Sequence, residues 1–217
     1  DGTVVTVLDG IRQKVSKGTR VLYAKGCAVR DSSRTGFKDA IETARNADAV
    51  VMVMGGSSAR DFSSEYEETG AAKVTINQIS DMESGEGYDR ATLHLMGRQL
   101  ELLEEISRLG KPVVLVLIKG RPLLMEGAIQ EAEAIVDAWY PGMQGGNAVA
   151  DVLFGDYNPA GRLTLSVPRS VGQLPVYYNT RRKGNRSRYI EEPGTPRYPF
   201  GYGLSYTTFE YSNPVIA

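Results

Sequence analysis

The segment 55–88 concentrates the residues of this sequence that could carry acid–base chemistry. Few of its residues are apolar, and within it or at its end lie eight carboxylates: Asp61, Glu65, Glu67, Glu68, Asp81, Glu83, Glu86 and Asp89. So many carboxylates in one loop require exposure to solvent, a bound metal or a catalytic role. Calcium takes clustered oxygen ligands, but the EF-hand spacing with its fixed Gly and final Glu is missing. We therefore predict no metal site, and a solvated acidic loop is the plain alternative to a catalytic one.

Glu86 stands in the most specific setting among these carboxylates. It lies between Gly85 and Gly87, and Asp89 and Arg90 follow closely. Glycine allows backbone conformations closed to other residues and lets a ligand or another chain approach closely. Glu86 could therefore project from a loop tip into a neighbouring cleft, while Asp89 and Arg90 anchor the loop base through charge-assisted pairs. A glycine-rich turn with a surface Glu is the simpler alternative.

The pattern around this loop predicts strands alternating with helices. Continuous apolar runs, typical of strands buried on both faces, lie at 49–54 and 113–118, and a third strand is expected at 134–139. Apolar residues at helical spacing predict helices near 4–15, 37–44, 100–109, 127–131 and 145–153. Further short strands are expected at 20–24 and 162–167, with Ser33 or Thr35 as a helix cap. The fold class is therefore α/β, a mostly parallel sheet flanked by helices in an α/β sandwich.

The position of the acidic loop within this fold adds to its interest. Ligands of parallel sheets gather at the carboxyl ends of the strands. The segment 55–88 leaves from the carboxyl end of the expected strand 49–54. A loop this long within a compact domain is usually functional or a mistaken assignment, and this position favours function.

Composition excludes several other classes of function. The 217 residues carry a net charge of −1, whereas nucleic acid or an anionic membrane would call for a basic face. Cys27 and His94 are the only residues of their types, so neither a disulfide nor a Cys/His zinc cluster can form within the chain. Any histidine-dependent triad would have to use His94, which lies between two leucines.

Cofactor motifs are also missing from the sequence. Neither GxxxxGK[ST] nor GxGxxG occurs. The glycine-containing turn 141–146 opens an expected helix, as phosphate-binding loops do, so a nucleotide-binding flavodoxin-like module is one alternative. Tight packing between strand and helix is the other explanation of these glycines. We predict no cofactor.

The composition changes after Pro168. Residues 168–205 are rich in Pro, Gly, Tyr and Arg without helical periodicity, and we expect an extended linker there after a sandwich domain at 1–167. Residues 206–217 could begin a β-strand of a further domain. The first residue is Asp, which suggests a piece of a longer protein.

Several motifs resemble, in order, the C-terminal domain of glycoside hydrolase family 3, the β-glucosidases and β-xylosidases. The stretch Gly85-Glu86-Gly87-Tyr88-Asp89-Arg90 is similar to the acid/base loop of that family. The other similar stretches are 47–55, 93–99, 111–122, 138–148, 153–163 and 198–207. One departure is Met96, where the family commonly has Pro.

The resemblance implies a retaining, exo-acting β-glycosidase that removes terminal β-linked glucose or xylose. Glu86 would be the general acid/base, and Gly85, Gly87, Asp89 and Arg90 would support its loop. An N-terminal barrel would supply an Asp nucleophile, with the two carboxyl groups about 5–5.5 Å apart. Residues 206–217 would begin a fibronectin-III-like domain, and the protein would be periplasmic or secreted. The 217 residues alone would be inactive. A non-catalytic, carbohydrate-associated scaffold is the other alternative.

Overall fold

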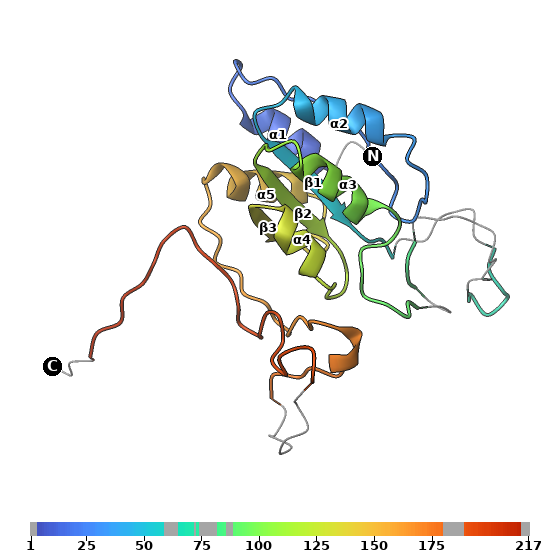
Figure 1. Ribbon diagram of the computed structural model, residues 1–217. Coiled ribbons are helices and arrows are strands. Elements are labelled where there is room, and N and C mark those ends of the chain that lie inside the picture. The colour runs from blue at the N-terminus through green and yellow to red at the C-terminus, as the bar shows by residue number, and fades with distance from the viewer. Residues whose placement is uncertain are drawn as a thin grey trace.

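A three-stranded parallel sheet forms the centre of the domain in the computed structural model, which describes residues 4–58, 65–71, 73, 82–85, 89–179 and 189–213 (Figure 1). The strands are β1 (Val50–Gly55), β2 (Val113–Ile118) and β3 (Ala134–Asp137), in the order β1-β2-β3. Val50 pairs with Val113, and Val114 with Ala134. All three segments are therefore strands, as predicted, although β3 ends two residues before the end of the predicted segment.

Helices cover both faces of this sheet. They are α1 (Val7–Lys14), α2 (Phe37–Arg45), α3 (Gln99–Ser107), α4 (Glu126–Glu131) and α5 (Gly145–Phe154), and a short 3-10 helix, η1, spans Val171–Gln173. Leu115 and Leu117 of β2 pack in one core cluster with α2, α3 and α4, whereas Val116 packs in another with α1 and α5. Successive side chains of a strand point to opposite faces, so the predicted α/β sandwich is confirmed.

The start of α2 differs from the prediction. Its N-cap is Gly36, which has no capping side chain. The hydroxyls of Ser33 and Thr35 instead bond each other at 2.6 Å, and Thr35 donates its N–H to the Ser33 hydroxyl at 3.1 Å. These local hydrogen bonds form a turn before the helix. Hydroxyl side chains often bond nearby groups in this way, in competition with capping the helix.

The prediction that β1 is buried on both faces is wrong. Met52 and Met54 are buried against α2 and α3, but Val51 and Val53 are 38% and 48% exposed. The strand lies at one edge of the sheet. The opposite helix layer, α1 and α5, packs over β2 and β3 instead.

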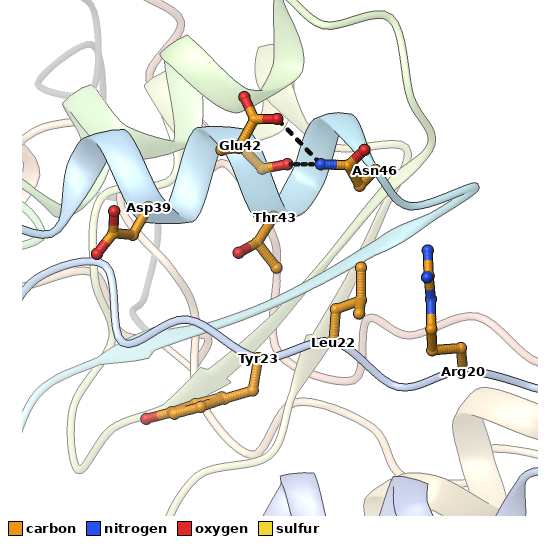
Figure 2. Close-up of a pocket in the computed structure, with 7 residues that line it drawn as sticks. All are labelled: Arg20, Leu22, Tyr23, Asp39, Glu42, Thr43 and Asn46. Atoms are coloured by element: carbon orange, nitrogen blue, oxygen red, sulfur yellow. Dashed lines mark hydrogen bonds between the residues drawn. The ribbon is translucent and has the colours of Figure 1, made fainter.

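The expected strands at 20–24 and 162–167 are also absent from the described structure. Segment 20–24 is extended, and Leu22 and Tyr23 leave it on opposite sides, but it has no strand pairing (Figure 2). Segment 162–167 is joined to 198–202 by backbone hydrogen bonds, including an isolated antiparallel bridge between Val167 and Tyr198. Extended local sequence makes a strand only where a neighbouring strand supplies hydrogen bonds.

Residues after Pro168 have no further regular structure except η1 in the part that is described (Figure 1). They contact the sandwich again where Arg197 pairs with Glu126 of α4 and where the Tyr206 hydroxyl donates to the Val152 carbonyl of α5. Within the same described ranges, no helix has both the length and the apolar content required to span a bilayer.

Candidate active-site loop

The acidic loop begins where β1 ends, and Gln99 fixes that point. The buried Gln99 amide accepts the Gly55 N–H at 2.8 Å and donates to the Gly55 carbonyl at 2.9 Å. Next along the chain, Gly56 donates its N–H to the Ile118 carbonyl of β2 at 3.0 Å. Buried backbone groups need such partners. The exit of the loop is therefore set by main-chain hydrogen bonds to the sheet and to α3.

A buried ion pair closes the base of the loop. Glu83 Oε2 and Arg90 Nη1 lie 2.9 Å apart, with their side chains 2% and 3% exposed. Glu83 also donates its N–H to the Ser57 carbonyl at 2.8 Å, beside the bridge between Ser57 and Met82. A Cβ atom at Gly56 would overlap the Glu83 carboxylate, so only glycine allows this approach. The Glu83 backbone therefore joins the outgoing and returning parts of the loop, and the ion pair connects Glu83 to Arg90 on the other side of Glu86.

Further contacts hold Arg90 and its surroundings. Arg90 Nη2 donates to the His94 carbonyl, and Arg30 donates to the Met82 carbonyl at 2.8 Å. Arg90 Nε is buried with no hydrogen-bond partner among the described residues. The guanidinium thus links Glu83 to the chain that leads into α3, at the cost of one unsatisfied donor.

Asp89 connects the returning end of the loop to the turn after β2. Its carboxylate accepts from Arg121 at 2.7 Å and from the Arg90 N–H at 2.7 Å. The Arg90 main-chain N–H first, and then the Arg121 guanidinium, hold the pKa of the Asp89 carboxyl below its ordinary value. The Asp89 side chain is 71% exposed, so this pair positions the chain more than it stabilises the fold.

The turn after β3 holds the outgoing end of the loop. The Tyr140 hydroxyl accepts the Ser58 N–H at 3.1 Å. The Tyr140 ring lies against Gly120, where an added Cβ would be 2.6 Å from a ring carbon. The turns that follow β2 and β3 therefore both contact the loop, at the carboxyl edge of the sheet.

The predicted site residues divide into two groups. Gly85, Asp89 and Arg90 are described, and Gly85 is exposed. Glu86 and Gly87 lie outside the described residues, so the role of Glu86 stays a prediction. The structure places the residues before and after Glu86 at the carboxyl edge of the sheet, where Glu83, Asp89 and Arg90 hold them through ion pairs and hydrogen bonds.

Other candidate sites gain no support from the described structure. The N–H of Gly146, at the start of α5, donates to the Val5 carbonyl at 3.1 Å. This glycine serves close packing of α5 against the chain entering α1, which disfavours the nucleotide-binding alternative. A cavity of about 480 Å³ lies between segment 20–24 and α2 (Figure 2), and none of its lining residues is a predicted site residue. In the part of the chain that is described, no group of three His, Cys, Asp or Glu side chains could hold a metal ion.

Comparison with known proteins agrees with this architecture. The sequence model of the glycosyl hydrolase family 3 C-terminal domain matches residues 2–206. The chain belongs to glycosyl hydrolase family 3. A β-xylosidase from Formosa agariphila is 44% identical over 98% of the chain, and a periplasmic β-glucosidase from Salmonella typhimurium is 39% identical over 98%. The solved structure of a β-glucosidase from Erythrobacter marinus superposes with a TM-score of 0.78 over 97% of the chain, at 38% identity.

This family 3 domain covers only part of those relatives. It spans 27% of the Formosa enzyme, 29% of the Salmonella enzyme and 29% of the Erythrobacter structure. The resemblance found in the sequence motifs is therefore confirmed for the family and for its C-terminal domain. The activity of the whole protein is a separate question.

Several residues that build the loop base were not singled out by the sequence. Glu83 was one acidic residue among eight, whereas Gln99, Arg121 and Tyr140 carried no chemical signal of their own. Gln99 occupies the apolar-facing start of a helix, and a polar residue there is the one hint of a buried hydrogen-bonding role.

Proposed function

We propose that this family 3 domain supplies Glu86 as the general acid/base of a retaining β-glycosidase. The buried Glu83–Arg90 pair is the observation that carries the proposal, because it closes the chain on both sides of Glu86. A catalytic carboxylate must be held in a defined geometry to transfer a proton. A solvated acidic turn would need no buried ion pair at its base.

The chemistry follows from a two-step displacement. A nucleophilic carboxylate from an N-terminal barrel attacks the anomeric carbon while Glu86 protonates the departing glycosidic oxygen. Glu86 then takes a proton from the water that hydrolyses the glycosyl-enzyme intermediate. The relatives named as β-xylosidase and β-glucosidase support terminal β-xylosides or β-glucosides as substrates.

The leaving group provides the test of Glu86. In the full-length protein that carries this domain, Glu86→Ala should lower kcat/KM for alkyl glycosides or disaccharides by about 10²–10⁴-fold. A dinitrophenyl glycoside, whose leaving group needs little protonation, should keep its kcat/KM within about tenfold. Added azide should raise kcat with this activated substrate and yield a glycosyl azide, because azide attacks the intermediate without a general base.

Glu67→Ala is the matched control, because Glu67 is an exposed carboxylate of the same loop. It should leave both substrates unaffected. Equal losses for both substrates in Glu86→Ala, or a leaving-group effect in Glu67→Ala alone, would reject the assignment to Glu86. Unchanged activity in both variants would favour the non-catalytic scaffold.

The proposal also includes two further domains of the full-length enzyme. A barrel domain supplies the Asp nucleophile and most of the sugar pocket, and a fibronectin-III-like domain begins within 206–217. A periplasmic or secreted location is proposed, since one relative is named as periplasmic. The 217-residue chain alone should not hydrolyse a nitrophenyl β-glucoside or β-xyloside. Clear turnover by the purified chain would contradict this division of labour.

A further inference from the structure

Lys119 is an unusual residue to find in the interior of this domain. It directly follows β2, and with 1% exposure it is the largest fully buried side chain in the described structure. Its Nζ lies 2.8 Å from Asp137 Oδ2 of β3 and 4.0 Å from the centre of the Trp139 ring. Burial lowers the pKa of the Lys119 ammonium, and Asp137 opposes that shift. An apolar side chain of similar size would fill this space without the desolvation of a charge.

The contacts of Lys119 converge on the turn after β3. Trp139 has a φ of 53°, the only positive value at a non-glycine residue among those described. This backbone conformation is strained for a side chain as large as Trp, and it persists only where neighbours enforce it. Lys119 holds Trp139 twice, because its N–H donates to the Trp139 carbonyl at 3.2 Å and its ammonium lies over the ring.

Lys119 connects the turns after β2 and β3, and these same two turns contact the acidic loop. Tyr140, directly after Trp139, accepts the Ser58 N–H at the outgoing end of the loop. Arg121, two positions after Lys119, pairs with Asp89 at the returning end. A shift of either turn would therefore move one end of the loop relative to the other.

We propose that Lys119 is a positioning residue, which cross-links the turns after β2 and β3 and thereby sets the placement of the Glu86 loop. It acts through Trp139 and Asp137 and does not contact the substrate. The inference rests on the proposed acid/base role of Glu86. The cation is required in this arrangement, because Asp137 Oδ1 is already buried without a partner among the described residues, and a neutral side chain would leave the whole carboxylate unpaired.

The test uses the full-length protein and the same pair of substrates. Lys119→Met should lower kcat/KM for an alkyl glycoside by about 10–100-fold, because a misplacement near 1 Å costs about 10²-fold. A dinitrophenyl glycoside should lose less than about threefold, since its departure makes little use of the acid. The ratio of the two losses separates misplaced acid from general damage.

Two further variants keep the test decisive if Lys119→Met folds poorly. Lys119→Met with Asp137→Asn removes the unpaired charge, so it should recover thermal stability while the leaving-group effect persists. Lys14→Met is the control, because Lys14 of α1 pairs with Asp151 of α5 and with Asp156, and neither partner belongs to the acidic loop. It should leave the ratio of the two kcat/KM values unchanged.

Each outcome has a defined meaning. Equal losses for both substrates in the Lys119 variants, or no loss in the stable double variant, would overturn the positioning role. If Glu86→Ala shows a leaving-group effect and the Lys119 variants do not, only the inference about Lys119 fails. If Glu86→Ala shows none, the acid/base assignment fails, and with it the basis for this inference.

Discussion

Replacing Arg90 by Met should destabilise the domain by about 3 kcal/mol. Breaking a buried ion pair by removing one partner costs about 3–5 kcal/mol, because the other charge is left uncompensated. Here both side chains are almost fully buried and the charged atoms lie 2.9 Å apart. Met has a length similar to the aliphatic part of Arg, so the variant removes the charge with little loss of packing.

Two smaller contributions decide where in that range the value falls. The His94 carbonyl loses the hydrogen bond from Arg90 Nη2, which adds about 1 kcal/mol. The substitution also removes Arg90 Nε, a buried donor without a partner in the described structure, which returns about 1–3 kcal/mol. Together these place the expected loss at the lower end of the range for a buried pair.

Urea unfolding of the 217-residue chain, followed by circular dichroism, measures this loss as a lower midpoint with an unchanged slope. Arg45→Met is the matched control, because Arg45 and its partner Glu42 are both more than half exposed. This substitution should lower the stability by less than about 0.5 kcal/mol. Adding Glu83→Gln to Arg90→Met should recover about 1–2 kcal/mol, since no charge is then left buried alone. A stability within the control range for Arg90→Met, or a double variant less stable than the single one, would refute the reasoning.

Three other substitutions test the rest of the loop base by the same unfolding measurement. Asp89 has a lowered pKa, so its contribution is present above the unfolded value of 3.8 and is lost as pH falls through the folded pKa. Asp89→Asn should therefore lower stability at about pH 6, and its difference from the parent should shrink as pH falls below 3.8. A difference that does not change with pH would contradict the linkage. Gln99→Leu should cost about 2–4 kcal/mol, because both main-chain groups of the last β1 residue lose their partner. Gly56→Ala should cost about 1–3 kcal/mol through overlap with the Glu83 carboxylate, whereas Gly161→Ala, with nothing near the added Cβ, should be close to neutral.

Local sequence predicted the strands and helices that carry their own apolar signal. The runs that became β1 and β2 are apolar without interruption, so burial in a sheet was the expected outcome. The expected strands at 20–24 and 162–167 failed for a different reason. Their residues favour extended backbone, but a strand also needs a hydrogen-bonded neighbour, and that depends on distant parts of the chain.

The candidate site shows the same division between local and distant information. The glycines around Glu86 are a local feature, so one carboxylate among eight could be singled out from the sequence. The partners at the loop base are not local, because Arg121 and Tyr140 reach the loop only after β2 and β3 have paired side by side. Glu83 looked like a solvated acid, and only the fold brings Arg90 over it in a buried setting.

These contacts also bear on where a nucleophile can come from. Glu83 and Asp89 are the described carboxylates that flank Glu86 most closely, and each is engaged by an arginine. If Glu83 left its pair, the Arg90 guanidinium would remain buried as an uncompensated charge, which is strongly destabilising. Asp89 is tied to Arg121 and to the main chain. A retaining mechanism requires a second carboxyl group about 5–5.5 Å from the acid. Both of these neighbours are occupied in holding the loop, which agrees with the proposal that the nucleophile comes from a separate barrel domain.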